Sequence, residues 1–523
     1  MGVPMGLGSI ASIVRQHREE RPDAVAIVEA GREHTWRSID EASSTLANAM
    51  AAAGVERGDR VARIEKNGID YFVMVFAASK IGATLVDVNW RLAPPEKLHI
   101  VNDAGAKLLF VGNDFAGELG MIEPGLETVT ATVMIGEGGD GRPSLEEFTA
   151  GHPATDPGVE SSPDDIALQL YTSGTTGLPK GVMLSNHNLF ALIDEVPEKW
   201  QIGPDSVSHV VMPTFHIAGS GWGIVSLAMG AKAILDRDVD PSLILREIEE
   251  YKITTAIYVP AVLAFLQIVP NANDHDLSSM ELIAYGASPI TEDVLRGAMS
   301  QFSGTDFVQV YGLTETTGAV VELPPEDHDP ENKPELLRAA GKPYPWIEMK
   351  IVGDDGSEVG DGEIGEVWLR GSQIMVGYWN KPDETAKALN DEGWFRSGDA
   401  GYVKDGYLFL HDRVKDMIVS GGENVYPAEV ENAIMGCPGV ADAAVIGVPD
   451  EKWGEAVKAI VVKAPDTDVT PQAIIAWARE RIAGFKVPKS VDFVDELPRN
   501  PSGKILKKDL RAPYWADRDR QIG

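Results

Sequence analysis

Apolar residues form short strand-like runs and longer helix-like stretches that follow one another along most of the chain. Residues 69–80 are apolar over the length of a helix, and residues 83–88 follow as a short strand. Pro241 opens another helical stretch, after which residues 254–259 have the pattern of a buried strand. Strands that alternate with helices predict βαβ units and a largely parallel sheet. The same pattern predicts strands at 166–171, 282–285 and 307–311, and helices at 186–195, with Ser185 as N-cap, and at 291–299.

The pattern changes after Pro324. Residues 324–334 are polar and rich in proline, which predicts a loop, and residues 347–411 form short strand patterns separated by glycine turns. We therefore expect an α/β fold with a large N-terminal domain, residues 1–412, that includes a small antiparallel subdomain. Residues 413–523 are expected to form a small α+β domain. Its predicted elements are helices at 427–435 and 471–483 and strands at 443–448, 459–462 and 490–494.

The charge of the chain excludes some partners. The chain has 523 residues, is 44% hydrophobic and carries a net charge of −34. An acidic surface of this kind argues against nucleic acid and anionic lipid as partners. Residues 413–523 contribute only −1 to the net charge, so an anionic ligand can still be received there.

Other features of the composition exclude several kinds of site. Cys437 is the single cysteine, which rules out an intrachain disulfide and a thiolate metal cluster, and its apolar helical surroundings predict a buried side chain. The histidines lack HxxxH and HExxH spacing, so no zinc site is expected, and the absence of GxSxG argues against a serine hydrolase. No apolar run approaches the ~20 residues of a membrane span, and the N-terminus lacks the pattern of a secretory signal. We expect a cytoplasmic protein.

The strongest local motif is a string of glycines and hydroxyl residues that follows the strand at 166–171. Glycines allow a close backbone approach, the hydroxyls offer donors to phosphate oxygens, and Lys180 adds a positive charge, so the string suits a polyphosphate. It differs from the P-loop of NTPases, because Gly181 follows Lys180 where that loop has Ser or Thr. A plain surface loop is the less favoured alternative. The string reads Tyr171-Thr172-Ser173-Gly174-Thr175-Thr176-Gly177-Leu178-Pro179-Lys180-Gly181.

Four weaker motifs follow along the chain. Tyr311-Gly312-Leu313-Thr314-Glu315-Thr316 comes after a strand, where an aromatic ring can stack on a base and a carboxylate can hold Mg²⁺, although an ordinary turn explains it as well. Residues 393–399 place Asp399 in a tight turn, where it suits two ribose hydroxyls or a structural Asx-turn. Charged residues at 412–416 and a lysine at the end of Asn500-Pro501-Ser502-Gly503-Lys504 would each be taken as solvated if they stood alone.

The ordered set YTSGTTGLPKG, YGLTET, GWFRSGD, DRVKD, SGGENVYP and NPSGK resembles the acyl-adenylate-forming superfamily, and it is most similar to bacterial fatty-acyl and aryl acid:CoA ligases. The resemblance runs from about residue 9 to residue 511. It implies a large N-terminal domain with a small, mobile C-terminal lid, and a reaction that joins a carboxylic acid to AMP before the acyl group passes to CoA. It implies ATP, Mg²⁺ and coenzyme A as cofactors.

The resemblance also assigns roles to particular residues. Lys504 matches the catalytic lysine between the carboxylate and the α-phosphate, Lys415 the hinge, and His216 an aromatic gate between the acyl and nucleotide pockets. Glu315 and Thr175 match the positions that hold Mg²⁺. The nucleotide-binding positions are Thr172, Ser173, Gly174, Thr175, Thr176, Gly177, Lys180, Gly286, Ala287, Ser288, Tyr311, Gly312, Thr316, Asp399, Arg413 and Lys504.

The acyl pocket is expected just beyond His216. Gly219, Gly221 and Trp222 follow it, and small glycines leave room for a ligand that Trp222 could close or shape. A tryptophan packed in the core is the alternative. Tyr285 stands where many members of the superfamily carry glycine.

Three function classes stay open from the sequence. The leading one is an acid:CoA ligase for a medium or long fatty acid or a bulky cyclic or aryl acid. The second is an acyl-AMP ligase that forms an amide or loads a carrier protein, and the third is a phosphotransferase or a nucleotide-binding regulator. The expected partners are a small carboxylic acid, ATP and CoA, and a homodimer is compatible with the sequence.

Overall fold

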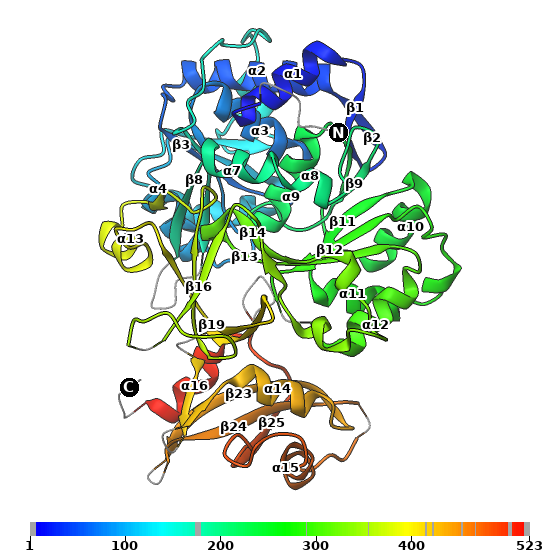
Figure 1. Cartoon of the computed structure of the whole chain (residues 1–523). Helices are drawn as coiled ribbons and strands as arrows, with labels where there is room; N and C mark the ends of the chain where they lie inside the picture. The colour runs from blue at the N-terminus through cyan, green and yellow to red at the C-terminus, as the bar shows by residue number, and fades with distance from the viewer. Residues whose placement is uncertain are drawn as a thin grey trace. The chain divides into compact units, whose positions relative to one another are not determined.

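The computed structural model of the chain describes residues 7–172, 179–288, 290–353, 355–413, 416–420, 423–450, 453–465, 467–499 and 505–516 (Figure 1). Contacts between residues divide it into two compact units, residues 1–348 with 370–395, and residues 349–369 with 396–523. The antiparallel subdomain expected in the large domain thus packs mainly with the C-terminal part. The boundary between two domains that is expected at residue 412 stays a prediction.

The first unit contains a seven-stranded sheet in the order β18-β8-β7-β4-β3-β5-β6. The pairs β7–β4, β4–β3, β3–β5 and β5–β6 are parallel, whereas β8 pairs antiparallel with β7 and with β18. The strands are β3 Arg60–Ile64, β4 Thr84–Asp87, β5 Leu108–Gly112, β6 Ala131–Ile135, β7 Ile166–Thr172, β8 Lys180–Ser185 and β18 Gly377–Tyr378. Helices of this region are α1 Ile10–Glu20, α2 Trp36–Ala52, α3 Ile69–Lys80, α4 Pro94–Ala104, α5 Leu119–Ile122 and α6 Leu145–Thr149.

A nine-stranded sheet of the first unit has the order β15-β14-β13-β12-β11-β9-β10-β1-β2. Its central strands are parallel and β13–β14 is an antiparallel pair. The strands are β1 Val25–Glu29, β2 Arg32–Thr35, β9 Val207–Val210, β10 Lys232–Leu235, β11 Thr255–Tyr258, β12 Leu282–Gly286, β13 Asp306–Leu313, β14 Gly318–Leu323 and β15 Lys342–Pro343. Further helices of the unit are α7 Asn186–Ile193, α8 Val196–Lys199, α9 Ile217–Ala228, α10 Pro241–Tyr251, α11 Pro260–Ile268, α12 Glu292–Gln301 and α13 Pro382–Ala388.

Apolar side chains explain how the helices attach to this sheet. Helices α10, α11 and α12 gather beside β11 and β12 (Figure 1), and α11 contacts both of the others. Their inward residues, such as Ile248, Leu263 and Leu295, join Tyr258 and Ile283 of the strands in one buried cluster. Because the central strands run parallel, their carboxyl ends meet at one edge of the sheet, which is where ligands bind in folds of this class.

The second unit contains two smaller sheets. The four-stranded sheet has the order β16-β17-β19-β20, and its strands lie between residues 348 and 413. The five-stranded sheet has the order β22-β21-β24-β23, and β25 pairs parallel with β24. Their strands are β16 Glu348–Val352, β17 Gly365–Arg370, β19 Phe395–Lys404, β20 Tyr407–Arg413, β21 Ile418–Ser420, β22 Glu423–Val425, β23 Val440–Asp450, β24 Gly454–Lys463 and β25 Ser490–Val494. The helices are α14 Pro427–Met435, α15 Pro471–Arg479 and α16 Lys507–Trp515.

Alternation along β23 gives the five-stranded sheet two buried faces. Ala443 and Val445 pack with residues of α14 and α15, whereas Ala444 and Ile446 pack with Leu510 of α16 on the opposite side. Successive residues of a strand point to opposite faces, so a strand buried on both sides must be apolar throughout. This explains the continuous apolar run at 443–448.

The fold class predicted from the pattern is confirmed. Helices α3 and α14 and strand β25 have the predicted bounds, and Ser185 caps α7 by accepting from the Asn188 amide. Strand β8, residues 180–185, was not predicted. One expectation was wrong, because α15 ends at Arg479 rather than at residue 483. Cys437 is buried as predicted, but it follows the end of α14.

Within the described part of the chain, the helices are too short or too polar for any of them to cross a lipid bilayer.

The polar, proline-rich segment 324–334, predicted to be a loop, carries a buried histidine. His328 is 7% exposed, its Nδ1 contacts the Pro324 carbonyl oxygen at 2.9 Å, and its Nε2 contacts the Tyr285 hydroxyl at 2.9 Å. A neutral ring satisfies both contacts, with Nδ1–H donating to the carbonyl and Nε2 accepting from the hydroxyl. Burial lowers the pKa of His328 to about 4.

This histidine makes stability depend on pH. The folded-state pKa lies below the unfolded value of about 6.5, so the unfolded chain binds a proton in a pH range where the folded chain does not. Stability is therefore lost as the pH falls from about 6.5 toward 4. Between pH 7 and pH 5 the free energy of unfolding of the wild type is expected to fall by ~2 kcal/mol because of His328. His328→Gln lacks this contribution. Urea unfolding of both proteins at the two pH values tests this, and a stability difference that is the same at both would contradict it.

Candidate active site

The carboxyl ends of β12 and β13 lie side by side and bring two predicted motifs together. Gly286 pairs with Val310 in parallel register, which places Gly286 and Ala287 beside Tyr311 and Gly312. The close approach requires glycine, because a Cβ atom at Gly286 would lie 2.1 Å from the Val310 carbonyl oxygen. Ala287 has a φ of +65°, a left-handed conformation that few residues other than glycine adopt. Such a strained backbone at the end of a strand is typical of a ligand site.

The turn after β13 fixes the direction of Glu315. Thr316 accepts a hydrogen bond from the Leu313 amide at 2.8 Å, and its hydroxyl lies 2.7 Å from the Gly318 carbonyl oxygen. Gly312 leaves no room for a side chain, since a Cβ atom there would lie 1.8 Å from the Gly318 oxygen. The Tyr378 hydroxyl donates to Glu315 Oε1 at 2.9 Å. The carboxylate is thus held in one orientation, and its oxygens are ligands of the kind that Mg²⁺ prefers.

Lys180 reaches the same region from the other sheet of the first unit. It begins β8, opposite Thr172 at the end of β7, and its ammonium group forms an ion pair with Glu384 of α13. The ammonium also lies 5.1 Å from the centroid of the Tyr378 ring. Tyr378 therefore contacts both residues, with the Lys180 ammonium over its ring and the Glu315 carboxylate at its hydroxyl group.

The positive charge of Lys180 affects the pKa of its partner, Glu384. The hydrogen bond from Lys180, together with one from Lys387, lowers the pKa of Glu384 to about 2. A polyphosphate would compete with this carboxylate for the ammonium group. The pair keeps Lys180 oriented when no phosphate is bound.

Several predicted positions lie outside the described residues. They are Ser173, Gly174, Thr175, Thr176 and Gly177 of the phosphate loop, the hinge Lys415 and the catalytic Lys504, and the side chain of Arg413 also lies outside the description. Their roles stay predictions.

The predicted ribose site lies within the second unit. Asp399 of β19 pairs directly with Arg413 of β20 in antiparallel register. Asp399 was expected in a tight turn, but it lies within β19. Glu366 Oε1 accepts from the Gly398 amide at 2.9 Å, and Ser397 Oγ accepts from the Asp399 amide at 3.0 Å. The two positions that the resemblance assigns to ribose are thus cross-strand neighbours.

His216 stands at the N-cap of α9, beside Phe215 at a ring distance of 4.5 Å. Burial and the nearby charge of Arg91 lower the pKa of His216 to about 4, so the ring is neutral at pH 7. Its Nε2 is shielded from solvent and has no hydrogen-bond partner among the described residues. A shielded nitrogen of this kind is a candidate contact for a polar ligand group, which agrees with a gate position.

The predicted acyl-pocket residues beyond His216 are packed by protein atoms. A Cβ atom at Gly219 would lie 2.3 Å from the Met212 carbonyl oxygen. Trp222 is 2% exposed, stacks on Trp200 at 5.4 Å between ring centroids, and donates from Nε1 to Ser208 Oγ at 2.9 Å. These surroundings favour the core alternative for Trp222. That Gly219, Gly221 and Trp222 line an acyl pocket stays a prediction.

Sequence reasoning missed the residues that support the motifs from a distance. Tyr378 and Glu384 contact Glu315 and Lys180, respectively. Gln373 is fully buried, and its amide group donates to the Ala319 carbonyl oxygen at 2.9 Å and accepts from the Trp346 indole at 2.6 Å. The sequence around these residues carries no motif, and only the pairing of β18 with β8 brings Tyr378 to the site.

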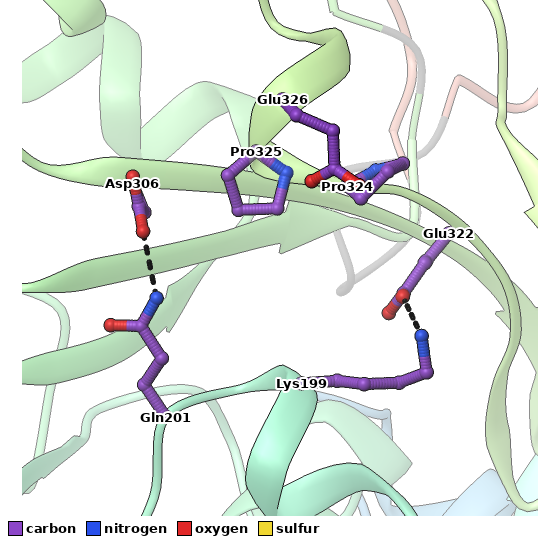
Figure 2. A pocket seen from close by; sticks show the side chains of 7 residues that line it. All are labelled: Lys199, Gln201, Asp306, Glu322, Pro324, Pro325 and Glu326. Carbon is purple, nitrogen blue, oxygen red and sulfur yellow. Dashed lines mark hydrogen bonds and ion pairs between the residues drawn. The ribbon is translucent and has the colours of Figure 1, made fainter.

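A surface hollow of about 540 Å³ lies elsewhere on the first unit (Figure 2). Lys199 pairs with Glu322 at 2.6 Å, and Gln201 donates to Asp306 at 2.7 Å. Asp306 begins β13, whereas the candidate site is at the other end of that strand. The hollow therefore does not belong to the candidate site. Its lining residues are Lys199, Gln201, Asp306, Glu322, Pro324, Pro325 and Glu326.

Comparisons with known proteins agree with this geometry. Residues 14–379 match the AMP-binding enzyme family, and residues 429–504 match the AMP-binding enzyme C-terminal domain. A fatty acid–[acyl-carrier-protein] ligase of Streptomyces coeruleorubidus is 40% identical, over 97% of this chain and 96% of its own. A feruloyl-CoA synthase of Amycolatopsis is 38% identical, over 97% of this chain and 99% of its own. The crystal structure of the anthranilate CoA ligase AuaEII with anthranoyl-AMP has a TM-score of 0.89 at 28% identity, with 97% of each chain covered.

Proposed function

This chain belongs to the AMP-binding enzyme family of adenylate-forming ligases, and on that premise we propose that it is an AMP-forming acid:CoA ligase. The proposed substrate is a medium or long fatty acid or a bulky cyclic or aryl acid. A cytoplasmic location, where ATP and CoA are both present, is part of the proposal. The observation that carries it is the meeting of Lys180, Tyr378 and Glu315 beside the strained ends of β12 and β13.

The first step is adenylation. One carboxylate oxygen attacks the α-phosphorus of ATP, the bond to the β-phosphate oxygen breaks, and pyrophosphate leaves with its electron pair. Two anions must meet, so the site has to supply positive charge where negative charge gathers. Lys180 is proposed to hold the terminal phosphates after it releases Glu384, and Lys504 is proposed to bridge the carboxylate and the α-phosphate. Mg²⁺, held by Glu315, would neutralise phosphate charge.

Binding of the nucleotide is assigned to the ends of β12 and β13 and to Asp399 of β19. The Tyr311 ring is proposed to stack on adenine, with Gly286 and Ala287 on the other side of the slot. Asp399 is proposed to accept hydrogen bonds from the two ribose hydroxyls. In the second step the CoA thiolate attacks the acyl carbon, and AMP leaves. His216 is neutral at pH 7 and adds no positive charge at the proposed gate.

The choice of CoA as acceptor is supported by the surface of the second unit. Phe485 is 39% exposed, and the Lys486 ammonium lies 5.6 Å from its ring centroid. Trp453 is also 39% exposed and lies 5.8 Å from the Lys489 ammonium. Exposed aromatic rings beside ammonium groups suit an adenine base and its phosphates, and the near-neutral charge of this region does not repel them.

A carrier protein or an amine is the second candidate acceptor, because one relative is named a fatty acid–[acyl-carrier-protein] ligase. The acceptors are separated by giving the enzyme a preformed acyl-adenylate with CoA and a phosphopantetheinyl carrier protein together. The proposal expects acyl-CoA as the main product. Acylated carrier with CoA left unused would contradict it.

Phe485→Ala tests the acceptor site. Loss of one stacked base costs ~1–3 kcal/mol, so KM for CoA is expected to rise between about fivefold and about 150-fold. Pyrophosphate release with acid and ATP in the absence of CoA should not change. Phe265→Ala is the matched control, since Phe265 is 52% exposed on α11 of the first unit. An unchanged KM for CoA in Phe485→Ala would remove this surface from CoA binding.

A further inference from the structure

Three polar residues from separate elements meet inside the first unit, away from the candidate active site residues. His209 lies in β9, Asp236 directly follows β10, and Glu247 lies on the inward side of α10. They are 0%, 4% and 7% exposed, respectively. One ligand atom from each lies within 4.8 Å of the others. A buried meeting of two carboxylates and an imidazole needs an explanation, because isolated buried charges are costly.

The distances in this cluster fit a common ligand. His209 Nε2 lies 3.0 Å from Asp236 Oδ2 and 3.6 Å from Glu247 Oε2. Around a metal ion bound at ~2.0–2.2 Å, tetrahedral ligands are separated by about 3.4 Å. Glu247 Oε2 is shielded from solvent and has no hydrogen-bond partner among the described residues. A buried carboxylate oxygen that points at two other ligand atoms and lacks a partner is an open coordination position.

The other side of the imidazole is already held. His209 Nδ1 lies 2.8 Å from the Tyr258 hydroxyl, which is fully buried at the end of β11. A histidine that binds a metal through one nitrogen usually has its other nitrogen fixed by an outer hydrogen bond, and Tyr258 supplies this contact. Nε2 is thereby directed at the two carboxylates.

We propose that His209, Asp236 and Glu247 bind one divalent cation of the zinc class. Two carboxylates and a neutral imidazole carry a formal charge of −2, which one divalent ion neutralises. The alternative is two protons, one on the imidazole and one shared between the carboxyl groups of Asp236 and Glu247. Mixed nitrogen and oxygen donors favour zinc or a neighbouring transition metal over magnesium or calcium. A second carboxylate oxygen can complete a four-coordinate site.

The proposed ion is structural. It ties the carboxyl ends of β9 and β10 to helix α10, and the chain runs on from β9 to Phe215 and His216. No zinc site was expected because the histidines lack HxxxH and HExxH spacing. Such spacing reveals only ligands along one helix, whereas these three ligands come from two strands and a helix. This inference does not depend on the identity of the acid or of the acceptor.

Metal content of the full-length, untagged protein tests the proposal. The protein is expressed in zinc-supplemented medium, dialysed against a mild chelator and measured by mass spectrometry of the metals. About one zinc per chain is expected for a single closed site. Glu247→Gln keeps the size of the side chain but removes the anionic oxygen, and its zinc content is expected to fall at least about tenfold. Protein grown with cobalt should show the visible absorption of four-coordinate cobalt(II), which Glu247→Gln should lose.

Two further variants make the result decisive. Asp236→Asn removes a second ligand and replaces Glu247→Gln if that variant does not fold. His328→Gln removes a buried histidine that also contacts a tyrosine hydroxyl but has no carboxylate ligand beside it, and it should keep its zinc. Substoichiometric metal in the wild type under both growth conditions would overturn the proposal and leave the proton-sharing network. Equal metal in the wild type, Glu247→Gln and Asp236→Asn would also overturn it.

Discussion

Lys504→Ala is expected to lower acid-dependent pyrophosphate release by ~10²–10³, because removal of one group that stabilises developing charge has an effect of this size. The carboxylate approaches the α-phosphate as one anion approaching another, and Lys504 is the cation that the NPSGK motif assigns to that place. The thioester step does not join two anionic groups in this way. A preformed acyl-adenylate should therefore react with CoA at close to the wild-type rate.

The control for this prediction is Lys508→Ala. Lys508 is exposed in α16, four residues beyond Lys504, so its removal changes the net charge equally without touching the proposed role. It should keep both half-reactions. Pyrophosphate release by Lys504→Ala at the wild-type rate would show that Lys504 is not the catalytic lysine.

Trp222→Ala is expected to reduce the free energy of unfolding by ~3–5 kcal/mol, as for other large-to-small changes at buried aromatic residues. The ring is almost fully buried, stacks on Trp200 and donates to Ser208, so its loss leaves a cavity and removes one of the hydrogen bonds of the Ser208 hydroxyl. The order of preference among acids of increasing size should not change. A melting curve beside kcat/KM for a series of acids measures both quantities.

Trp222→Phe separates packing from hydrogen bonding. It keeps most of the buried ring but removes the donor to Ser208, which should cost only ~1 kcal/mol. The opposite result would return Trp222 to the acyl pocket: a shift of preference toward longer or bulkier acids in Trp222→Ala, with an unchanged melting temperature.

The elements that could be predicted from the sequence are those with a strong local pattern. Helix α3 is apolar along its whole length, α14 begins with Pro427 at its first position, and β25 is bounded by turn residues. Strand β8 was not predicted because a glycine-rich segment after a strand commonly leads into a helix, whereas here β8 pairs antiparallel with β7. Local patterns do not show which strand a segment will pair with.

The residues of the candidate site also divide into those that a local motif predicts and those that only the folded sheet brings together. Tyr311, Glu315 and Lys180 stand in motifs whose chemistry is visible in a few consecutive residues. Tyr378 and Glu384 contact them from about 60 to 200 positions away along the chain, and the pairing of β18 with β8 that brings them there is a property of the sheet. His209, Asp236 and Glu247 meet for the same reason, since three elements must pack before the cluster exists.

The central claim is that this chain converts an acid, ATP and CoA into an acyl-CoA, AMP and pyrophosphate. Phosphorus NMR of the nucleotide products, with mass spectrometry of the thioester, tests it in a single incubation with a panel of fatty and aryl acids. The account predicts AMP and pyrophosphate in amounts equal to the acyl-CoA formed, and no product without an acid. Formation of ADP and phosphate, or AMP and pyrophosphate without consumption of CoA by any acid that is activated, would contradict it.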